Sequence, residues 1–256
     1  MAIEILPNSA WGNAARVLAT NTSDVALADQ VGIENVTGGP RYLSYAGAGT
    51  GNLRVVYVNK SGGIQYDRVV IAKASNHLGH FVRLRDWLTY PSTTAPAFTD
   101  DPFNEPLVGP RGEDFVYSAG LSASLQAVGL ELDSGAGGSY SKVVHQVFFS
   151  TAFTLSDVRG VTRTRLPKFS RYAIKRKSYQ VREEVQIVAI GLTRAQAQAF
   201  QQLYRLREEP LYIYDSQGIQ IREKLLYGLV QSYQVGVPFH DLHTLTINFV
   251  VLEYWL

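Results

Sequence analysis

The sequence has 256 residues, of which 46% are hydrophobic and 18% are charged, and its formal net charge is +2. It contains no cysteine, which excludes a disulfide framework and a thiolate metal site. No window approaches the roughly 18 apolar residues of a membrane span, and the first residues lack the basic and apolar regions of a signal peptide, so we expect a chain that folds in a cytosol without a membrane segment.

Charge is distributed unevenly along the chain. Residues 1–150 contain 10 Lys and Arg against 13 Asp and Glu, whereas residues 151–256 contain 14 against 9. The change of sign coincides with a change of pattern near Phe149. The sequence therefore predicts two domains, 1–150 and 151–256.

The first domain shows strand signals separated by glycine-containing turns. Residues 53–58 and 65–71 flank one such turn, and residues 125–132 and 140–149 flank another, so both pairs predict β-hairpins. Short strands without helical periodicity favour a β-sandwich of jelly-roll type. Residues 88–111 contain five prolines, and a loop of this length is usually functional or ordered by a partner.

The second domain contains one well-marked helix, predicted over residues 194–207. Thr193 and Gln196 have the spacing of a capping box, and Pro210 ends the helix. The helical spacing predicts one apolar stripe that packs on a sheet. That stripe consists of Ala195, Ala199, Leu203 and Leu206, with Phe200 beside it.

The last strand, from Leu242 onwards, changes character along its length. Thr244, Thr246 and Asn248 alternate with apolar residues, which is typical of one solvated and one buried face. From Val250 the solvated face becomes apolar as well, which indicates cover on both sides. Either the strand end is internal or another subunit covers it. The candidate interface residues there are Val250, Leu252 and Tyr254.

The second domain begins with a basic run, with no acidic residue between Asp157 and Glu183. Interleaved aromatic residues would suit nucleic acid, but no nucleic-acid-binding motif accompanies them and the rest of the chain is nearly neutral. We therefore favour contact with an acidic partner subunit. The candidate interface residues in this run are Arg163, Arg165, Lys168 and Arg171.

Two histidine pairs, His77 with His80 and His240 with His243, have a spacing that binds metal on a helix. Nearby glycine and proline predict turns there, so we expect no metal site. An acidic group in and just after the proline-rich loop has the residue type for glycoside hydrolysis or calcium binding, but its spacing matches no EF-hand loop. This group is Asp100, Asp101, Glu105, Glu113 and Asp114.

An aromatic sugar-binding platform is the weaker alternative for the first domain. Trp87 and Tyr90 precede the proline-rich loop, and Trp11 is a further aromatic candidate. Such residues more often belong to a core or an interface. We predict no catalytic residue and no cofactor, and we expect the chain not to be an enzyme.

From Val128 to the C-terminus, the chain has an ordered series of characteristic segments, namely 129–132, 147–153, Leu192 with Thr193, 210–215, 226–230 and 245–249. On these residues, this part of the chain resembles the tail proteins of long-tailed, siphovirus-like bacteriophages. The order of strands and helix is similar to the tail-tube module of tube and distal-tail proteins, a β-sandwich or barrel with one flanking helix. The first half resembles the galactose-binding-like β-sandwich that often accompanies it.

The resemblance implies a structural virion protein, assembled in the host cytoplasm and located in the phage tail. The tail-tube-like module would form a homo-oligomeric ring, expected to be a hexamer, around a channel that DNA crosses without specific binding. The ring would sit at the distal tail or tail tip and contact the tail tube, the hub and the tape measure. The alternative function is a carbohydrate-binding adhesion module of a tail or cell-surface assembly.

Overall fold

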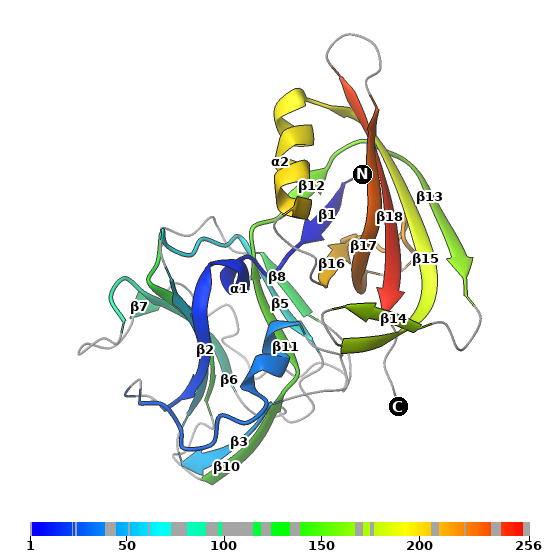
Figure 1. The fold of residues 1–256 in the computed structure, drawn as a ribbon. Coiled ribbons are helices and arrows are strands. Elements are labelled where there is room, and N and C mark those ends of the chain that lie inside the picture. Colours follow the sequence, from blue (N-terminus) through cyan, green and yellow to red (C-terminus); the bar gives the residue numbers. More distant parts are fainter. Residues whose placement is uncertain are drawn as a thin grey trace. The chain divides into compact units, whose positions relative to one another are not determined.

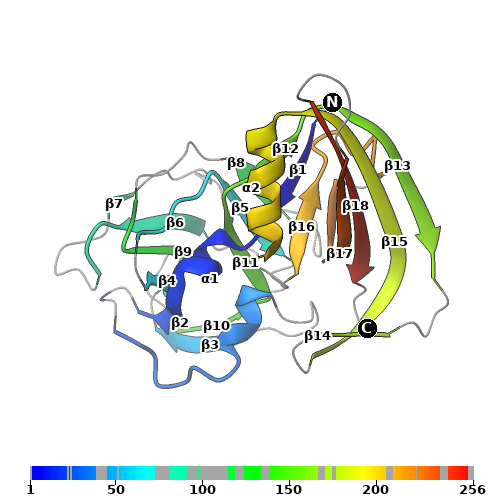
Figure 2. The same ribbon diagram turned by 45° about the horizontal axis from the view of Figure 1, so that its top comes forward.

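A computed structural model describes residues 2–21, 23, 25–38, 45–50, 52–60, 62–72, 81–90, 97–98, 115–118, 124–133, 139–166, 171–174, 177–205, 210–222, 224–236 and 242–252. The fold is mainly β, with several antiparallel sheets (Figures 1 and 2). The chain forms two compact units. We call Asn8–Thr151 the inserted unit and Met1–Pro7 with Ala152–Leu256 the terminal unit.

The division differs from the expected domains at the N-terminus. Strand β1 (Ile3–Leu6) pairs with β12 (Phe153–Leu155) and β16 (Leu211–Tyr214), so the first residues belong with the C-terminal part of the chain. The other boundary, after Thr151, lies next to the predicted one. A four-residue strand carries no sequence signal for partners in the second half of the chain, which is why an expected domain of 1–150 included it.

The inserted unit contains most of the short elements. Its helical segments are α1 (Ser9–Asn13) and the 3₁₀ helix η1 (Ile33–Thr37). Its strands are β2 (Ala14–Thr20), β3 (Tyr45–Thr50), β4 (Leu53–Asn59), β5 (Arg68–Ala72), β6 (Phe81–Trp87), β7 (Ala97–Phe98), β8 (Phe115–Ser118), β9 (Ala127–Asp133), β10 (Ser139–Val144) and β11 (Gln146–Ser150). They form sheets of order β2-β4-β9-β6-β7, β11-β5-β8 and β10-β3.

Neither predicted hairpin of the first half forms. Strand β4 pairs with β2 and β9, whereas β5 pairs with β8 and β11. Strand β9 pairs with β4 and β6, and β10 pairs with β3. Gly62 and Gly63 do adopt the positive φ that the first turn needs, at 82° and 83°. Turn residues indicate where a chain bends, but they do not specify which sheet the next strand joins.

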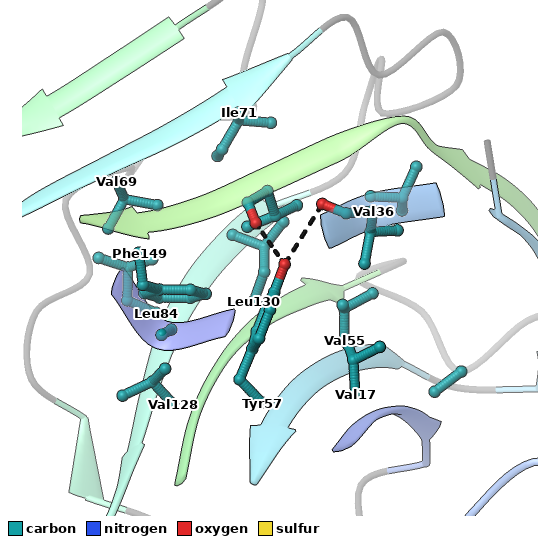
Figure 3. Packing of buried hydrophobic residues seen from close by; sticks show 14 of the residues in the cluster. Val17, Val36, Val55, Tyr57, Val69, Ile71, Leu84, Val128, Leu130 and Phe149 are labelled. Carbon is teal, nitrogen blue, oxygen red and sulfur yellow. Dashed lines mark hydrogen bonds between the residues drawn. The ribbon is translucent and has the colours of Figure 1, made fainter. Parts of the chain in front are cut away.

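The core of the inserted unit is built around Tyr57, which is fully buried (Figure 3). Its hydroxyl donates to the carbonyl of Val147 at 2.6 Å and lies 3.3 Å from the carbonyl of Val36. Burial raises the pKa of the Tyr57 hydroxyl, although a hydrogen bond from Asn8 opposes the shift. The ring of Phe149 meets that of Tyr57 edge-on at 5.7 Å. One buried phenol therefore links β4, η1 and β11.

The terminal unit contains one large sheet and one longer helix, and its strand order is β12-β1-β16-β17-β18-β15-β13. Strand β14 (Arg171–Ile174) pairs with β15 off this path. Figure 2 shows β15 curving along its length. The remaining elements are β13 (Val158–Arg165), β15 (Lys177–Leu192), α2 (Arg194–Arg205), β17 (Leu225–Gly236) and β18 (His243–Leu252).

Helix α2 confirms the predicted capping box but not the predicted stripe. The Gln196 amide donates to the Thr193 hydroxyl at 3.2 Å, and the Thr193 amide donates to the Gln196 side chain at 2.9 Å. Ala195 and Ala199, however, are exposed, while Ala197 and Phe200 are buried. Leu203 is half-buried, and Leu206 lies outside the described residues.

The size of Phe200 explains why helix α2 buries a different face from the predicted one. A helix that carries apolar residues on two faces buries the face with the larger side chain, because free energy scales with the apolar area removed from water. The Phe200 ring lies 5.4 Å from Tyr233 and 5.5 Å from Phe153. Helix α2 therefore packs on the core face of the sheet, against β15 and β18, and Phe200 reaches residues of β12 and β17.

Candidate functional site

The outer face of the terminal sheet, opposite its packed core, carries a row of uncharged polar side chains. Antiparallel pairing places Thr162 opposite Gln186, Gln186 opposite Asn248, and Asn248 opposite Ser232. In the next row, Thr246 stands opposite Gln234. We call these residues the polar patch: Thr162, Gln186, Ser232, Gln234, Thr246 and Asn248. All six are exposed or half-buried.

Hydrogen bonds tie the polar patch together across three strands. The Gln186 side-chain amide donates to Asn248 Oδ1 at 3.0 Å, and the Asn248 amide donates to Ser232 Oγ at 2.8 Å. The alternation in the last strand predicted this solvated face at Thr246 and Asn248, and Leu245, Ile247 and Phe249 are buried as expected. The patch is a pre-ordered surface of amides and hydroxyls without a formal charge.

The same outer face becomes apolar toward the end of β18. Val250 and Leu252, two of the predicted interface residues, are buried within a single copy of the chain, as are Tyr227 and Leu229. This burial agrees with the internal alternative, and the assignment of the two positions to a subunit interface stays a prediction. Tyr254, the third candidate there, lies outside the described residues.

The basic candidates are divided among different environments. Arg163 makes contacts inside the chain. Its Nε donates to Glu183 at 2.8 Å, and its other nitrogens contact Glu183 and the carbonyl of Ile221. Arg163 is therefore committed within the chain, although Arg165 is exposed on the same strand. Arg171 lies in β14 opposite Gln180, and Lys168 lies outside the described residues.

Strand β13 gives the terminal sheet an open edge. One side of β13 pairs with β15 from Val158 to Arg165, and no strand of the described part of the chain pairs with its other side. Most of its residues are exposed. An open edge of eight residues presents a row of backbone donors and acceptors to another chain.

The predicted aromatic sugar platform does not form a solvent-facing surface. Trp87 is only 1% exposed and packs with Val56 and Ala127. Tyr90 meets its ring edge-on at 5.7 Å, so both contribute to packing. A buried indole offers no face for stacking on a sugar ring. For Trp11, the third aromatic candidate, the side chain lies outside the described set.

A buried charged cluster in the inserted unit was not predicted. Glu131 accepts from Arg54 Nε at 2.6 Å, from Arg85 at 2.8 and 2.7 Å, and from Asn52 at 2.9 Å. Burial by itself raises the pKa of Glu131, but the hydrogen bonds and charges of Arg85 and Arg54 outweigh it and hold that pKa below its usual value. The sequence feature that could have indicated this cluster is Glu131 itself, an acid inside an apolar strand.

The remaining predicted sites are outside what the structure describes. The acidic group and His77, His80 and His240 fall on undescribed residues, whereas His243 begins β18. Within the described ranges, no three His, Asp or Glu side chains are grouped to hold a metal ion. No helix among those ranges has the length and apolar character to cross a membrane.

The chain thus presents an uncharged polar sheet face, an open edge strand and a buried ionic cluster. Only the first two are accessible to another molecule in the described part of the chain. Comparisons with protein-family models, with curated proteins and with solved structures found no match.

Proposed function

We propose that this chain is a structural protein of a bacteriophage tail that forms a ring at the distal tail and connects the tail tube to the hub. In this proposal the terminal unit is the tail-tube-like, ring-forming module. The inserted unit is an accessory sandwich of the jelly-roll, galactose-binding-like type. The observation that carries the proposal is the terminal sheet, which has α2 on its core face and ends at the open edge of β13.

The open edge supports assembly because its unpaired backbone groups can form hydrogen bonds with a strand of another chain. The described sheet has two different ends, the three-residue β12 and the eight-residue β13. A contact between unlike surfaces repeats from copy to copy and forms a ring when the rotation closes. Ring closure removes exposed edges, which otherwise promote aggregation.

The polar patch supports a channel that DNA crosses without being held. Proteins bind the phosphates of DNA mainly through Lys and Arg. None of the six residues of the patch is charged, and the nearest described acid on that face, Glu184, lies at its border. A wall of amides and hydroxyls neither attracts nor strongly repels a polyanion.

Mass measurement tests the proposal. Native mass spectrometry and light scattering of the purified chain should give a single closed oligomer, expected to be a hexamer, and negative-stain images should show rings. Double-stranded DNA should not bind the assembled protein at physiological salt. A protein that stays monomeric at every concentration, alone and with other tail proteins, contradicts the proposal.

A further inference from the structure

The loop between β16 and β17 is held more rigidly than a surface connection requires. The buried Asp215 carboxylate accepts the backbone amides of Gln217 at 3.1 Å, Gln220 at 2.7 Å and Ile221 at 3.4 Å. The backbone of Asp215 also bonds to Lys224 and Gly218, both at 2.9 Å. One carboxylate therefore fixes the path of the loop from Asp215 to Ile221.

A second set of contacts, made by Arg163, connects this loop to the edge of the sheet. Arg163 of β13 donates to the carbonyl of Ile221 and binds both carboxylate oxygens of Glu183 on β15. Ile221 itself is fully buried in the core of the terminal unit. The loop is thus anchored next to β13, the strand whose outer side is open in the described part of the chain.

The braced loop carries an apolar side chain into solvent. Ile219 lies between the amides that Asp215 holds, and it is 60% exposed. Arg222 follows with a φ of 58°, the one positive φ at a non-glycine residue of the described chain. A left-handed conformation at such a residue costs free energy, so the surrounding contacts must enforce it.

A rigid loop with an exposed apolar tip is suited to binding. Ordering a flexible loop reduces affinity, and a loop that is already ordered avoids this cost. Apolar anchors surrounded by polar residues account for much of the binding energy in protein interfaces. Ser216 and Gln217 provide exposed polar neighbours for Ile219.

We propose that the braced loop Asp215–Arg222 is a preformed contact surface for a second copy of this chain, with Ile219 as its apolar anchor. The occupant is a second copy because Arg163 places the loop beside the open edge of β13, the feature that carries the proposed ring. The inference therefore rests on the proposed function and adds a specific contact to it. Arg163 and Asp215 are positioning residues, since they act through the loop.

The first test compares the assembly of wild-type chain, Ile219→Asp and Val31→Asp by native mass spectrometry over a concentration series. Val31 is a matched control because it is 86% exposed and lies in the inserted unit. A charge buried at an interface anchor should weaken assembly about 30-fold or more, while Val31→Asp should assemble as the wild type does. Wild-type rings with unchanged Ile219→Asp rings would overturn the inference and leave the proposed function standing. A monomeric wild type would overturn both.

The second test does not depend on the folding of a charged variant. The chain has no cysteine, so Ile219→Cys and Val31→Cys each carry one thiol. Maleimide labelling at position 219 should be about 10-fold slower in the oligomer than in the monomer fraction, because a covered thiol reacts slowly. Labelling at position 31 should proceed at the same rate in both fractions. Equal labelling rates at position 219 would show that the loop is not covered, which overturns the inference.

Discussion

The two units each contain an arginine–glutamate cluster, but one cluster joins adjacent strands and the other joins a strand to a loop. In the inserted unit, Arg54, Arg85 and Glu131 join three adjacent strands, with side chains only 5%, 6% and 1% exposed. In the terminal unit, Arg163 is 18% exposed and joins Glu183 to a loop. The same chemistry therefore stabilises the interior of one sheet and fixes a surface loop at the edge of the other.

The largest expected effect follows from removing the charge at the centre of the buried cluster. Glu131→Gln leaves two buried guanidinium groups without their carboxylate, and breaking a buried ion pair in this way typically costs about 3–5 kcal/mol. We expect the inserted unit to lose stability by that amount in denaturant unfolding. Hydrogen exchange, read separately in peptides of each unit, should show faster opening in the inserted unit. Uniform loss in both units would contradict the assignment.

Acid should reproduce part of this effect in the wild type. The folded-state pKa of Glu131 is depressed below its ordinary value of 4.5, so its contribution to stability is present above that value and is lost as pH falls through the folded pKa. Urea unfolding at pH 7 and at about pH 3, followed by tryptophan fluorescence, measures this. The wild type should lose more stability than Glu131→Gln on acidification, and equal losses would exclude Glu131 as the titrating group.

The second comparison concerns glycines at close approaches in the two sheets. An added Cβ at Gly228 of β17 would lie 2.0 Å from the Val250 carbonyl oxygen, whereas one at Gly129 of β9 would lie 2.8 Å from that of Val55. We expect Gly228→Ala to destabilise the terminal unit by about 3 kcal/mol, and Gly129→Ala to have a smaller effect on the inserted unit.

Thermal or denaturant unfolding of both glycine variants measures the difference, and Gly160→Ala is the control. Gly160 lies in β13, and an added Cβ there has no neighbour within 4 Å. The control should therefore change stability by less than about 0.5 kcal/mol. A larger effect for Gly129→Ala than for Gly228→Ala would show that the inserted sheet is the less tolerant of the two.

Local signals in the sequence predicted several parts of the fold correctly. The capping box at Thr193 and the solvated face at Thr246 are both confirmed. Each depends on residues close together in the chain, where spacing alone determines geometry. The hairpin partners and the position of β1 were not predictable, because they depend on pairings between distant segments.

The candidate site was predictable only in part, for the same reason. Thr246 and Asn248 were recognised by alternation, but their row also needs Gln186 and Ser232 from other strands. Arg163 was predicted as an interface residue, because its separation in the chain from Glu183 and Ile221 does not indicate that these residues are in contact. The prediction of which face of α2 is buried was wrong, because periodicity identifies apolar stripes on a helix without indicating which stripe packs on the sheet.

The smallest expected effect distinguishes the two arginine clusters. Lysine keeps the charge of Arg163 but has no planar fork, so it cannot bind Glu183 with two nitrogens and reach Ile221 at the same time. We expect Arg163→Lys to cost about 1 kcal/mol in the terminal unit, and Arg165→Lys, at an exposed position, to have no measurable effect. Hydrogen exchange should accelerate mainly in the loop Asp215–Arg222. Because Glu131 bridges strands and Arg163 holds a loop, Arg163→Lys should loosen the loop without opening the sheet, and faster exchange across β15 and β18 would contradict that division.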